Sequence, residues 1–426
     1  MIIFESTFPK DFRKSEIKKI LDYVSTGKFC QLVCVPGAGK ATILRLLAHN
    51  RNLIKFHLPK KEKSLRFLYI NLLELASFEE TQIAKFLLIA LDQVPQTDAD
   101  SLILTKQFTE TVNSLANLNE TIIFLFDHFD EFQNRLPRLF FQMLKSAKNL
   151  AKYKFSAIFA TRRDLTDLID EEIVRNYWDF FVGNTVYLKI YDQKATDYMF
   201  IQIEKIFAKK LSRVDKHKIV SLTGGHAKLT KIIAELVLGQ NIELTNKLIL
   251  NNAQVQSALY EFWLALTSVE QHQLSQFAKN TKGAHFFDEY LINSDLITQT
   301  KHGSSNEYKF TIPIFGEFAA AMTPVSNYKI NYNPQTREIL KGKNVISELL
   351  TAQEFRLLRF LVQNLGRVIE RDEIISEVWP DTKNAEAISD EAIDQMVFRI
   401  RKKIEDEPSK PRHVLTVKGR GLRFEP

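Results

Sequence analysis

The chain has 426 residues, of which 45% are hydrophobic, 11% aromatic and 26% charged, as in ordinary globular proteins. Only 14 Gly and 12 Pro are spread over this length, which excludes collagen-like, mucin-like and largely disordered chains and leaves room for about three domains. The formal net charge is +7, and residues 399–423 alone hold nine Lys and Arg against three Asp and Glu. A surface that binds a polyanion is therefore expected in the C-terminal region.

The sequence shows no sign of a membrane or an oxidising compartment. It contains no run of eighteen or more uninterrupted apolar residues, and residues 1–8 lead directly into a charged helical pattern. We therefore expect a cytoplasmic protein without a membrane partner. Cys30 and Cys34 lie four residues apart in one apolar run, so a strand would point both to the same face. They are expected to be small buried hydrophobic residues and not a disulfide.

The first 190 residues alternate short apolar runs with helical patterns, which predicts a parallel sheet. The apolar runs are residues 31–35, 68–72, 121–126, 156–160 and 185–190. Between them, residues 81–93 and 136–150 carry apolar side chains at helical spacing and are long enough to cover the faces of a sheet. The sequence therefore predicts an α/β core over residues 1–190.

The remaining chain is expected to form a lid and two further modules. Helical patterns predict a lid over residues 191–252, in which the pair Gly224 and Gly225 separates two helices. Residues 253–322 carry helical patterns followed by a hairpin turning at Gly303 to Asn306, which predicts a winged helix.

A polar linker, Thr323 to Asn327, precedes the last segment. There, strand-like alternation followed by helical patterns predicts a second winged-helix, α+β module over residues 326–426.

A candidate phosphate-binding loop follows the first apolar run, in "QLVCVPGAGKATILRLLAH". A strand, a glycine-containing turn and a helix in succession let backbone N–H groups cradle phosphate oxygens, and Lys40 would reach the β- and γ-phosphates. The usual motif is G-x-x-x-x-G-K-[ST], whereas this chain carries Cys34 at the first glycine and Ala41 at the hydroxyl position. The candidate cofactor-binding residues are Pro36, Gly37, Ala38, Gly39, Lys40, Ala41 and Thr42.

The departures at this loop leave metal binding and turnover open. Gly37 can supply the tight turn in place of Cys34, but Ala41 has no oxygen to offer Mg²⁺. Thr42 lies about 100° further round the helix and does not take the same ligand position. We therefore expect nucleotide binding with at most slow hydrolysis. A strand, turn and helix that bind no ligand remain the alternative.

A second motif, "TIIFLFDHFDEF", ends an apolar strand in Asp127, the position of an acid that holds Mg²⁺ through water. Asp127 is the candidate metal ligand, and Glu131 is a candidate for orienting an attacking water. Arg162 and Arg163 follow the next predicted strand, and either could sense nucleotide state, with Arg162 the candidate catalytic residue. Helix capping by the acids and a solvated role for the arginines are the alternatives.

These residues, in this order, resemble the STAND group of AAA-like P-loop NTPases, over residues 1 to about 320. The opening "FRKSEIKKILDYVSTGKFCQLVCVPGAGK" is similar to that group's first helix and phosphate loop, with Phe12 and Arg13 near the start of its adenine pocket. "TGGHAKL" is similar to its lid motif, with Ala227 in place of proline; His226 is a candidate for the nucleotide site or for packing of the lid. The resemblance implies an ATP/ADP switch.

The last hundred residues strongly resemble the OmpR/PhoB-type winged-helix DNA-binding domain, in "LTAQEFRLLRFLVQNLGRVIERDEIISEVWP" and "AIDQMVFRIRKKIEDEPSKPRHVLTVKGRGLRF". Independently, Ile393, Val397, Ile400 and Ile404 form an apolar stripe at helical spacing. The side chains off this stripe are Gln395, Phe398, Arg399, Arg401 and Lys402, the layout of a recognition helix.

The final "VLTVKGRGLRF" predicts a hairpin wing with Lys418 and Arg420 at its tip, within reach of a minor groove. The resemblance adds Thr416 as a wing contact and places Arg399 and Arg401 near bases or phosphates. Phe398 and Met396 stand where the family often has polar readers, so we expect contact with thymine methyl groups. The resemblance also implies tandem binding by two copies to half-sites about one helical turn apart.

Taken together, the sequence predicts a regulator of transcription whose C-terminal reader of double-stranded DNA is gated by ATP or ADP. Two alternatives stay open. One is an active DNA-dependent ATPase of replication-initiator or loader type, and the other is a nucleotide-independent DNA-binding protein with a vestigial phosphate loop. A signal ligand or partner protein is allowed for, but no residue pattern identifies it.

Overall fold

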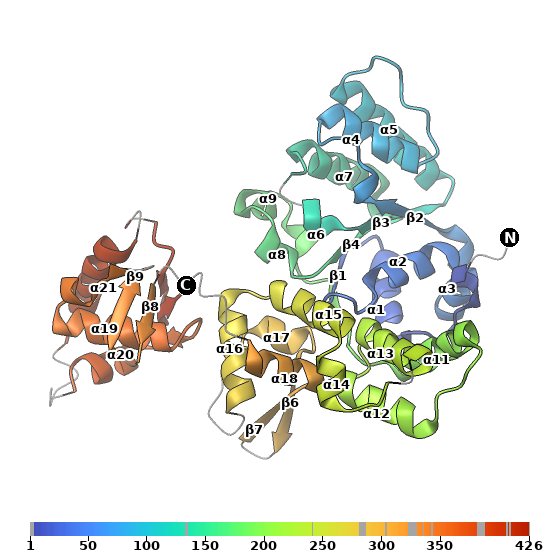
Figure 1. Cartoon of the computed structure of the whole chain (residues 1–426). Helices are drawn as coiled ribbons and strands as arrows, with labels where there is room; N and C mark the ends of the chain where they lie inside the picture. Colours follow the sequence, from blue (N-terminus) through green and yellow to red (C-terminus); the bar gives the residue numbers. More distant parts are fainter. Residues whose placement is uncertain are drawn as a thin grey trace. The chain divides into compact units, whose positions relative to one another are not determined.

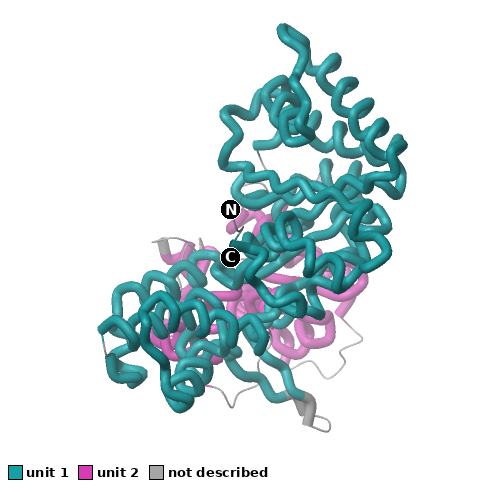
Figure 2. The backbone as a smooth tube through the Cα atoms, turned by 90° about the vertical axis from the view of Figure 1, so that its right-hand side faces the viewer, with its two compact units in different colours: residues 1–265, 292–315 teal, residues 266–291, 316–426 magenta. Residues whose placement is uncertain are grey.

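The computed structural model describes residues 4–132, 135–240, 242–280, 287–302, 305–322, 330–334, 336–341, 344–380, 388–405, 408 and 410–425. Its backbone contacts divide the chain into two compact units, which Figure 2 colours separately. Unit 1 holds Met1–Ala265 with Ile292–Phe315, and unit 2 holds Leu266–Leu291 with Gly316–Pro426. The predicted linker at residues 323–327 and residues 303–304 of the predicted hairpin turn lie outside the described residues. The four predicted domain boundaries stay predictions.

Unit 1 is built on a sheet of five strands in the order β2-β3-β4-β1-β5, with every pairing parallel. The strands are β1 (Cys30–Val33), β2 (Leu65–Asn71), β3 (Thr121–Asp127), β4 (Phe155–Thr161) and β5 (Thr185–Tyr187). Strands β1, β3 and β4 are buried along their whole length, as expected for parallel strands covered on both faces. The predicted parallel α/β core is confirmed.

Helices cover both faces of this sheet (Figure 1). They are α1 (Lys14–Val24), α2 (Lys40–His49), α3 (Arg51–His57), α4 (Glu80–Ala90), α5 (Ser101–Asn117), α6 (Phe129–Phe132), α7 (Arg138–Ala151), α8 (Leu165–Leu168), α9 (Glu171–Asn176) and α10 (Trp178–Phe181). Helices α4, α5 and α7 pack on one another and on β2, β3 and β4. Helix α1 contacts β1, β4 and β5, and α2 contacts β2, β3 and β4. The apolar spacing of residues 81–93 and 136–150 is thus used as predicted, in α4 and α7.

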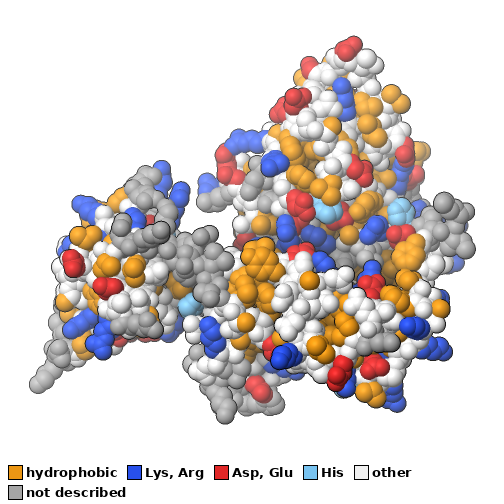
Figure 3. Space-filling view, viewed as in Figure 1, with side chains coloured by type: hydrophobic (Ala, Val, Ile, Leu, Met, Phe, Trp, Pro, Cys, Tyr) orange, Lys and Arg blue, Asp and Glu red, His pale blue; other side chains and the backbone are white. Residues whose placement is uncertain are grey.

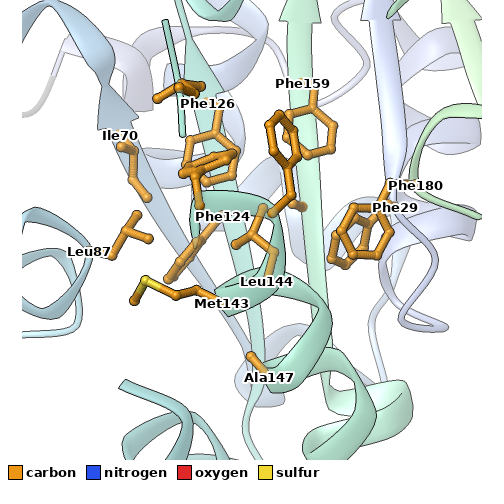
Figure 4. Packing of buried hydrophobic residues seen from close by; sticks show 14 of the residues in the cluster. Phe29, Ile70, Leu87, Phe124, Phe126, Met143, Leu144, Ala147, Phe159 and Phe180 are labelled. Carbon is orange, nitrogen blue, oxygen red and sulfur yellow. The ribbon is translucent and has the colours of Figure 1, made fainter. Parts of the chain in front are cut away.

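Phenylalanine side chains fill the layer between the sheet and α7 (Figure 4). The rings of Phe126 and Phe159, on neighbouring strands, are stacked with centroids 5.5 Å apart. Phe124 meets Phe155 edge to face at 5.4 Å, and such pairs contribute about 0.5–1.5 kcal/mol beyond their buried area. This packing fixes the strands whose ends carry the site described below.

The segment after β5 is helical, as predicted for a lid. It comprises α11 (Gln193–Phe207), α12 (Arg213–Thr223), α13 (Ala227–Gln240), α14 (Asn246–Leu250) and α15 (Ala253–Leu264). Gly224 and Gly225, with φ angles of 59° and 80°, separate α12 from α13, and this left-handed region favours glycine. A Cβ at Gly224 would lie 1.9 Å from the Thr311 carbonyl oxygen, so the chain there needs a residue without a side chain.

The next elements are α16 (Ser268–Lys279), α17 (Glu289–Asn293), the antiparallel hairpin of β6 (Ile297–His302) and β7 (Ser305–Phe310), and α18 (Pro313–Ala321). Helices followed by a hairpin are the order predicted for the first winged-helix module. Figure 3 shows Lys and Arg interspersed with Asp and Glu on the face that it draws.

The last hundred residues form the second predicted winged-helix module. An antiparallel sheet holds β8 (Ile330–Asn333), β9 (Glu338–Lys341) and β10 (Asn344–Val345), and a second holds β11 (Val368–Ile369), β12 (Val414–Val417) and β13 (Gly421–Phe424). The helices are α19 (Ala352–Gln363), α20 (Arg371–Val378) and α21 (Asp390–Ile404). One buried apolar cluster joins these helices to both sheets, so the module has its own core.

Two further expectations can be compared with the structure. Within the described residues, no helix is both long and apolar enough to cross a membrane. Cys30 and Cys34 are buried free thiols, and burial raises the pKa of both, that of Cys34 to about 11. Their predicted character as buried hydrophobic side chains is confirmed.

Candidate functional site

The candidate site of unit 1 lies at the carboxyl edge of the parallel sheet. Lys40 begins α2 after the loop that follows β1, the segment after β3 carries Asp130, and Arg162 directly follows β4. Because β4 and β1 are neighbours while β2 and β3 lie beyond β4, the chain reverses its strand order here. Such switch points at the carboxyl ends of parallel strands are where open α/β sheets bind ligands.

The loop between β1 and α2 has the backbone of a phosphate cradle. Gly37 and Gly39 have φ angles of 73° and 109°, and Gly39 directly precedes α2, whose first residue is Lys40. A Cβ on Gly37 would lie 2.8 Å from the Cβ of Lys228, so the lid leaves no room for a side chain there. Gly37 thus supplies the turn that Cys34 cannot supply at the first glycine position.

Lys40 and Arg162 share one carboxylate, that of Asp130. Lys40 Nζ donates to Asp130 Oδ1 at 2.9 Å, and Arg162 Nε donates to Asp130 Oδ2. The Asp130 side chain is 2% exposed. Burial alone would raise its pKa, but the charges and hydrogen bonds of Lys40 and Arg162 outweigh burial, so the pKa lies below its usual value. Asp130 is therefore an ionised partner of both cations.

Asp127, the predicted metal ligand, has different partners. Tyr69 on β2 donates its hydroxyl to Asp127 Oδ2 at 2.7 Å, and the His128 backbone N–H donates to Oδ1 at 2.9 Å. Burial, followed by this hydrogen bond, raises the Tyr69 pKa. Glu131 is half-exposed and lies 3.0 Å from His128 Nδ1. The structure thus brings Asp130 to Lys40, while Asp127 and Glu131 each make other contacts.

Within the described residues, no group of three or more His, Cys, Asp and Glu side chains is arranged to hold a metal ion. Ala41 adds no oxygen at the start of α2. Mg²⁺ binding, with Asp127 as the candidate ligand, stays a proposal.

The lid contacts the phosphate loop directly through the start of α13. His226 is fully buried; its Nε2 donates to the Pro36 carbonyl at 3.0 Å while its Nδ1 accepts from the Leu229 N–H at 3.3 Å. Burial lowers the His226 pKa to about 3, so the ring is neutral. The Lys228 N–H also donates to the Gly37 carbonyl at 3.2 Å. His226 therefore both caps the lid helix and holds it against the loop.

A cavity of about 510 Å³ opens between this loop, the segment from Phe4 to Arg13 and the lid. Gly37, Ala38, Gly39 and Thr42 line one side, while Pro36, Lys40 and Ala41 are not part of the lining. The aromatic wall consists of Phe4, Phe8, Phe12 and Tyr198, in which the Phe8 and Tyr198 rings lie 4.4 Å apart. A cavity of this size, apolar at one end and rich in backbone N–H groups at the other, is typical of small-molecule sites.

Arg13 and two lid lysines supply positive charge to the same cavity. Arg13 donates to the Lys189 and Ile190 carbonyls and pairs with Glu16 at 3.5 Å. Lys228 pairs with Glu261 of α15 at 2.5 Å, and Glu261 lies close enough to raise the pKa of Arg162. A carboxylate from α15 is thus coupled to the cations around the loop.

The candidate nucleic-acid interface of unit 2 is α21 with the wing of β12 and β13. The predicted stripe of Ile393, Val397, Ile400 and Ile404 is buried, and Gln395, Phe398, Arg399 and Lys402 are exposed. Lys402 Nζ lies over the Phe398 ring at 4.6 Å from its centroid. Met396 is 2% exposed within the core, so the prediction that it contacts thymine methyl groups is wrong.

Arg401 connects the helix to the wing. Its Nε donates to the Val414 carbonyl at 2.8 Å, and its Nη2 donates to Thr416 Oγ1 at 2.9 Å. Lys418 and Arg420 are exposed in the turn between β12 and β13, where Gly419 has a φ of 73°. The predicted wing tip is thus formed, and Arg401 positions it against α21.

Glu354, at the start of α19, organises the other side of α21. Its fully buried carboxylate accepts from Arg399 Nε at 3.0 Å and from Lys403 Nζ at 2.5 Å. Burial alone would raise its pKa, but these hydrogen bonds and that of the Thr351 N–H lower it to about 2. Arg399, predicted to contact DNA, therefore also anchors the helix, with about half of its side chain exposed.

Comparisons with known proteins identify the C-terminal module. Residues 347–424 match the family model described as "Transcriptional regulatory protein, C terminal". The transcriptional regulatory protein KdpE of Mycobacterium tuberculosis is 38% identical over 90 residues, which are 20% of this chain and 38% of that protein. The chain thus spans less than two fifths of this relative's length. The C-terminal module is a domain of the OmpR/PhoB type, as its sequence predicts.

Two solved structures are also similar. The DNA-binding domain of RstA from Klebsiella pneumoniae, in complex with the RstA box, is 23% identical and covers 23% of this chain and 91% of its own, with a TM-score of 0.20. A Walker-type ATPase of Pyrococcus abyssi is 13% identical and covers 72% of this chain and 95% of its own, with a TM-score of 0.43.

Several residues of these sites were not predicted from the sequence. They are Tyr69, Asp130, Lys228, Glu261 and Glu354. Asp130 and Glu354 carry a usable signal, because Asp130 lies three residues after Asp127 and Glu354 follows Thr351 in a capping-box pattern. Tyr69 and Glu261 carry none, since each meets its partner only through the fold.

Proposed function

We propose that this protein is a DNA-binding regulator of transcription in which nucleotide bound at the loop of residues 36–42 controls the C-terminal reader. The observation that carries the proposal is the closure of the lid on that loop, through His226 and Lys228, around a cavity in a chain that also holds an OmpR/PhoB-type domain. The occupant we assign is ATP or ADP, and the DNA is double-stranded.

The donor set of the cavity supports a nucleotide. Backbone N–H groups at Gly37 to Gly39 and the start of α2 suit phosphate oxygens, and Lys40 lies at the same helix end. At the other end, the half-buried ring of Phe8 and that of Tyr198 offer flat apolar surfaces for a base. In this assignment Arg162 senses the terminal phosphate. Asp127 is the candidate ligand of Mg²⁺, and Glu131 is the candidate for orienting the attacking water.

The control of DNA binding by nucleotide would arise from ion pairs around the loop that a polyphosphate has to break. Lys40 and Arg162 are held by Asp130, and Lys228 is held by Glu261 of α15. A nucleotide that draws these cations toward its phosphates releases Glu261, and α15 is followed in the chain by the first residues of unit 2. The regulation is bounded by how much better the nucleotide binds the DNA-competent conformation than the closed one.

At the DNA, we assign α21 to the major groove and the wing to the adjoining minor groove. Gln395, Phe398 and Lys402 would face base edges or phosphates, while Lys418 and Arg420 would contact the backbone at the wing tip. Two copies would bind half-sites about one helical turn apart.

The test is selection of binding sites from random duplex DNA with the full chain in ATP, ADP and no nucleotide, repeated with Lys40→Ala. Tandem sites whose recovery depends on nucleotide only in the unmodified chain would support the proposal. Equal recovery in all conditions would remove the gating and leave a DNA-binding protein with a vestigial loop. Recovery of no sequence, together with Mg²⁺-dependent hydrolysis that Asp127→Asn abolishes, would favour a DNA-dependent ATPase instead.

A further inference from the structure

A second concentration of positive charge lies in unit 1. Residues 10–63 hold thirteen Lys and Arg against four Asp and Glu, a larger excess than that of residues 399–423. The expectation that positive charge gathers in the C-terminal region therefore describes only part of the chain. In the structure, α1, α3 and the segment before α1 hold seven of these bases, and the others lie on α2 and in the connecting segments.

The lysines of this region surround one exposed aromatic ring, that of Phe56 on α3. Lys10 Nζ and Lys14 Nζ lie over the ring at 5.4 and 5.7 Å from its centroid, and 38% of the Phe56 side chain is exposed. A groove of about 420 Å³ beside the ring is lined by Phe8, Lys10, Asn52, Lys55 and Phe56. We call it the Phe56 groove.

Three of the four acids of this region lie beside other cations, and the fourth, Asp22, acts on His57. Glu16 is buried against Arg13, Glu62 lies 3.8 Å from Arg51, and Asp11 lies 3.6 Å from Lys194. Within the described part of the chain, Lys10, Lys14 and Lys55 form no ion pair with a carboxylate. Their charges therefore lie around the Phe56 ring, with no carboxylate of the described residues at ion-pair distance.

The effect of these charges extends to a neighbouring side chain. Burial and the charges of Lys14 and Lys18 lower the pKa of His57, against an opposing effect of Asp22. The residue next to Phe56 thus experiences the positive charge of two of the lysines of α1. Such a field attracts an anion with several charges spread over a surface.

We propose that the Phe56 groove binds the phosphate backbone of double-stranded DNA that flanks the site of the C-terminal reader. The proposal rests on the DNA binding assigned above, because that reader brings DNA to the chain and raises its local concentration at the groove. Lysine ammonium groups at Lys10, Lys14 and Lys55 contact phosphates without reading sequence. Phe8 also lines the nucleotide cavity, so the groove and the cavity share one side chain.

The experiment measures the affinity of the full chain for a duplex of about 20 base pairs, which holds two half-sites, and for a longer duplex with about 20 further base pairs on each side. The sequence is the site selected from random DNA. Salt is varied from about 50 to 200 mM, and the slope of log affinity against log salt is compared. The variant Lys10→Gln/Lys14→Gln/Lys55→Gln keeps the apolar stems and removes three charges. The control Lys205→Gln/Lys218→Gln/Lys247→Gln removes three charges from exposed lysines elsewhere in unit 1.

We expect the longer duplex to bind the unmodified chain with a steeper slope than the short one. The triple variant at the groove should lose that difference, because the slope falls by about 0.9 for each phosphate contact removed. The control variant should keep the difference. On the short duplex, both variants should have the slope of the unmodified chain. Equal slopes for groove variant and control on the longer duplex would overturn the proposal.

Two further outcomes are distinct. If the groove variant lowers binding to vesicles of phosphatidylserine and phosphatidylcholine but leaves the DNA slopes unchanged, the groove is a lipid-binding surface and the DNA assignment fails. If the slope difference on DNA is lost in the groove variant but no nucleotide changes any affinity, the groove proposal stands and the gating proposal falls.

Discussion

The cavity of unit 1, which we propose binds a nucleotide, and the DNA-binding domain of unit 2 both carry positive charge, but they hold it in opposite ways. Beside the phosphate loop, Lys40 and Arg162 share the buried carboxylate of Asp130, and Lys228, which lines the cavity, pairs with Glu261. At the wing tip, Lys418 and Arg420 are exposed in a two-strand turn. On our proposal, a phosphate that binds at the first site has to displace these carboxylates, whereas the cations of the second site are already exposed.

This difference separates the source of selectivity for a ligand, at the cavity, from the source of affinity for polyanions, at the wing. A ligand that replaces internal carboxylates must offer several negative charges at defined positions, so we expect the cavity to prefer polyphosphates to single anions. Exposed cations attract any polyanion, and their contribution falls steeply with salt. One region is thus suited to a switch and the other to docking.

The largest expected effect concerns Glu354, the fully buried carboxylate that anchors α21. Its pKa of about 2 in the fold lies below the ordinary 4.5, so it contributes stability that is present above about pH 4.5 and is lost as the pH falls toward 2, up to about 3 kcal/mol. In a Trp178→Phe/Trp263→Phe background, Trp379 fluorescence reports urea unfolding of this module alone. Glu354→Gln should lower stability at pH 7 and flatten its pH dependence. An unchanged pH dependence would show that Arg399 and Lys403 are free for DNA.

Lys40→Ala should weaken nucleotide binding by about 10- to 100-fold, the value of a charge-assisted hydrogen bond to phosphate. The fold should persist, because Asp130 keeps Arg162 as its partner. Calorimetry with ATP and ADP measures the change, with Lys106→Ala on the exposed face of α5 as the control. Equal affinity in both variants would place the nucleotide elsewhere.

The double variant Lys418→Gln/Arg420→Gln should weaken DNA binding by about tenfold or more at 0.1 M salt and reduce the salt slope by about 1.8, or 0.9 per phosphate contact. Fluorescence anisotropy on the selected duplex provides the measurement. Lys279→Gln/Arg337→Gln, which removes two exposed charges of the same unit, should leave the slope as it is. If the wing variant has the same salt slope as this control, Lys418 and Arg420 do not contact the phosphates of DNA.

Asp130→Asn gives the smallest effect and the opposite sign. With the competing carboxylate neutralised, Lys40 and Arg162 should bind phosphates more readily, so ATP affinity measured in EDTA should rise by about three- to tenfold. Glu131→Gln, whose partner is His128, should leave it unchanged. If Asp130→Asn instead weakened ATP binding in EDTA, the carboxylate of Asp130 would organise the loop and would not compete for its cations.

The architecture was largely predictable, because it follows from local patterns. All five strands of the sheet fall on the apolar runs of the sequence, and Gly224 with Gly225 ends a lid helix as expected. Continuous apolar runs separated by amphipathic helices leave few alternatives to a covered parallel sheet.

The hydrogen-bond partners of the site residues were less predictable, because they depend on the direction that the backbone takes after each strand. After β3 the chain passes through His128 at a left-handed φ of 58°, and this turn carries Asp130 toward Lys40 while Asp127 stays against Tyr69. Met396 shows the same limit. Its helix is covered by α19 and joined to the wing by Arg401, so the buried face of α21 is wider than a single stripe of four residues.

The hydrogen bonds of Arg401 to Val414 and Thr416 have a consequence for the geometry of an operator. They tie the recognition helix and the hairpin into one body, so the distance between the bases under the helix and those beside the wing is a property of the protein. An insertion of one base pair inside a half-site then has to be absorbed by twisting or bending of the DNA. The spacing between half-sites depends instead on the contact between two copies of the protein. We therefore expect natural operators to vary in the spacing between half-sites and not within a half-site.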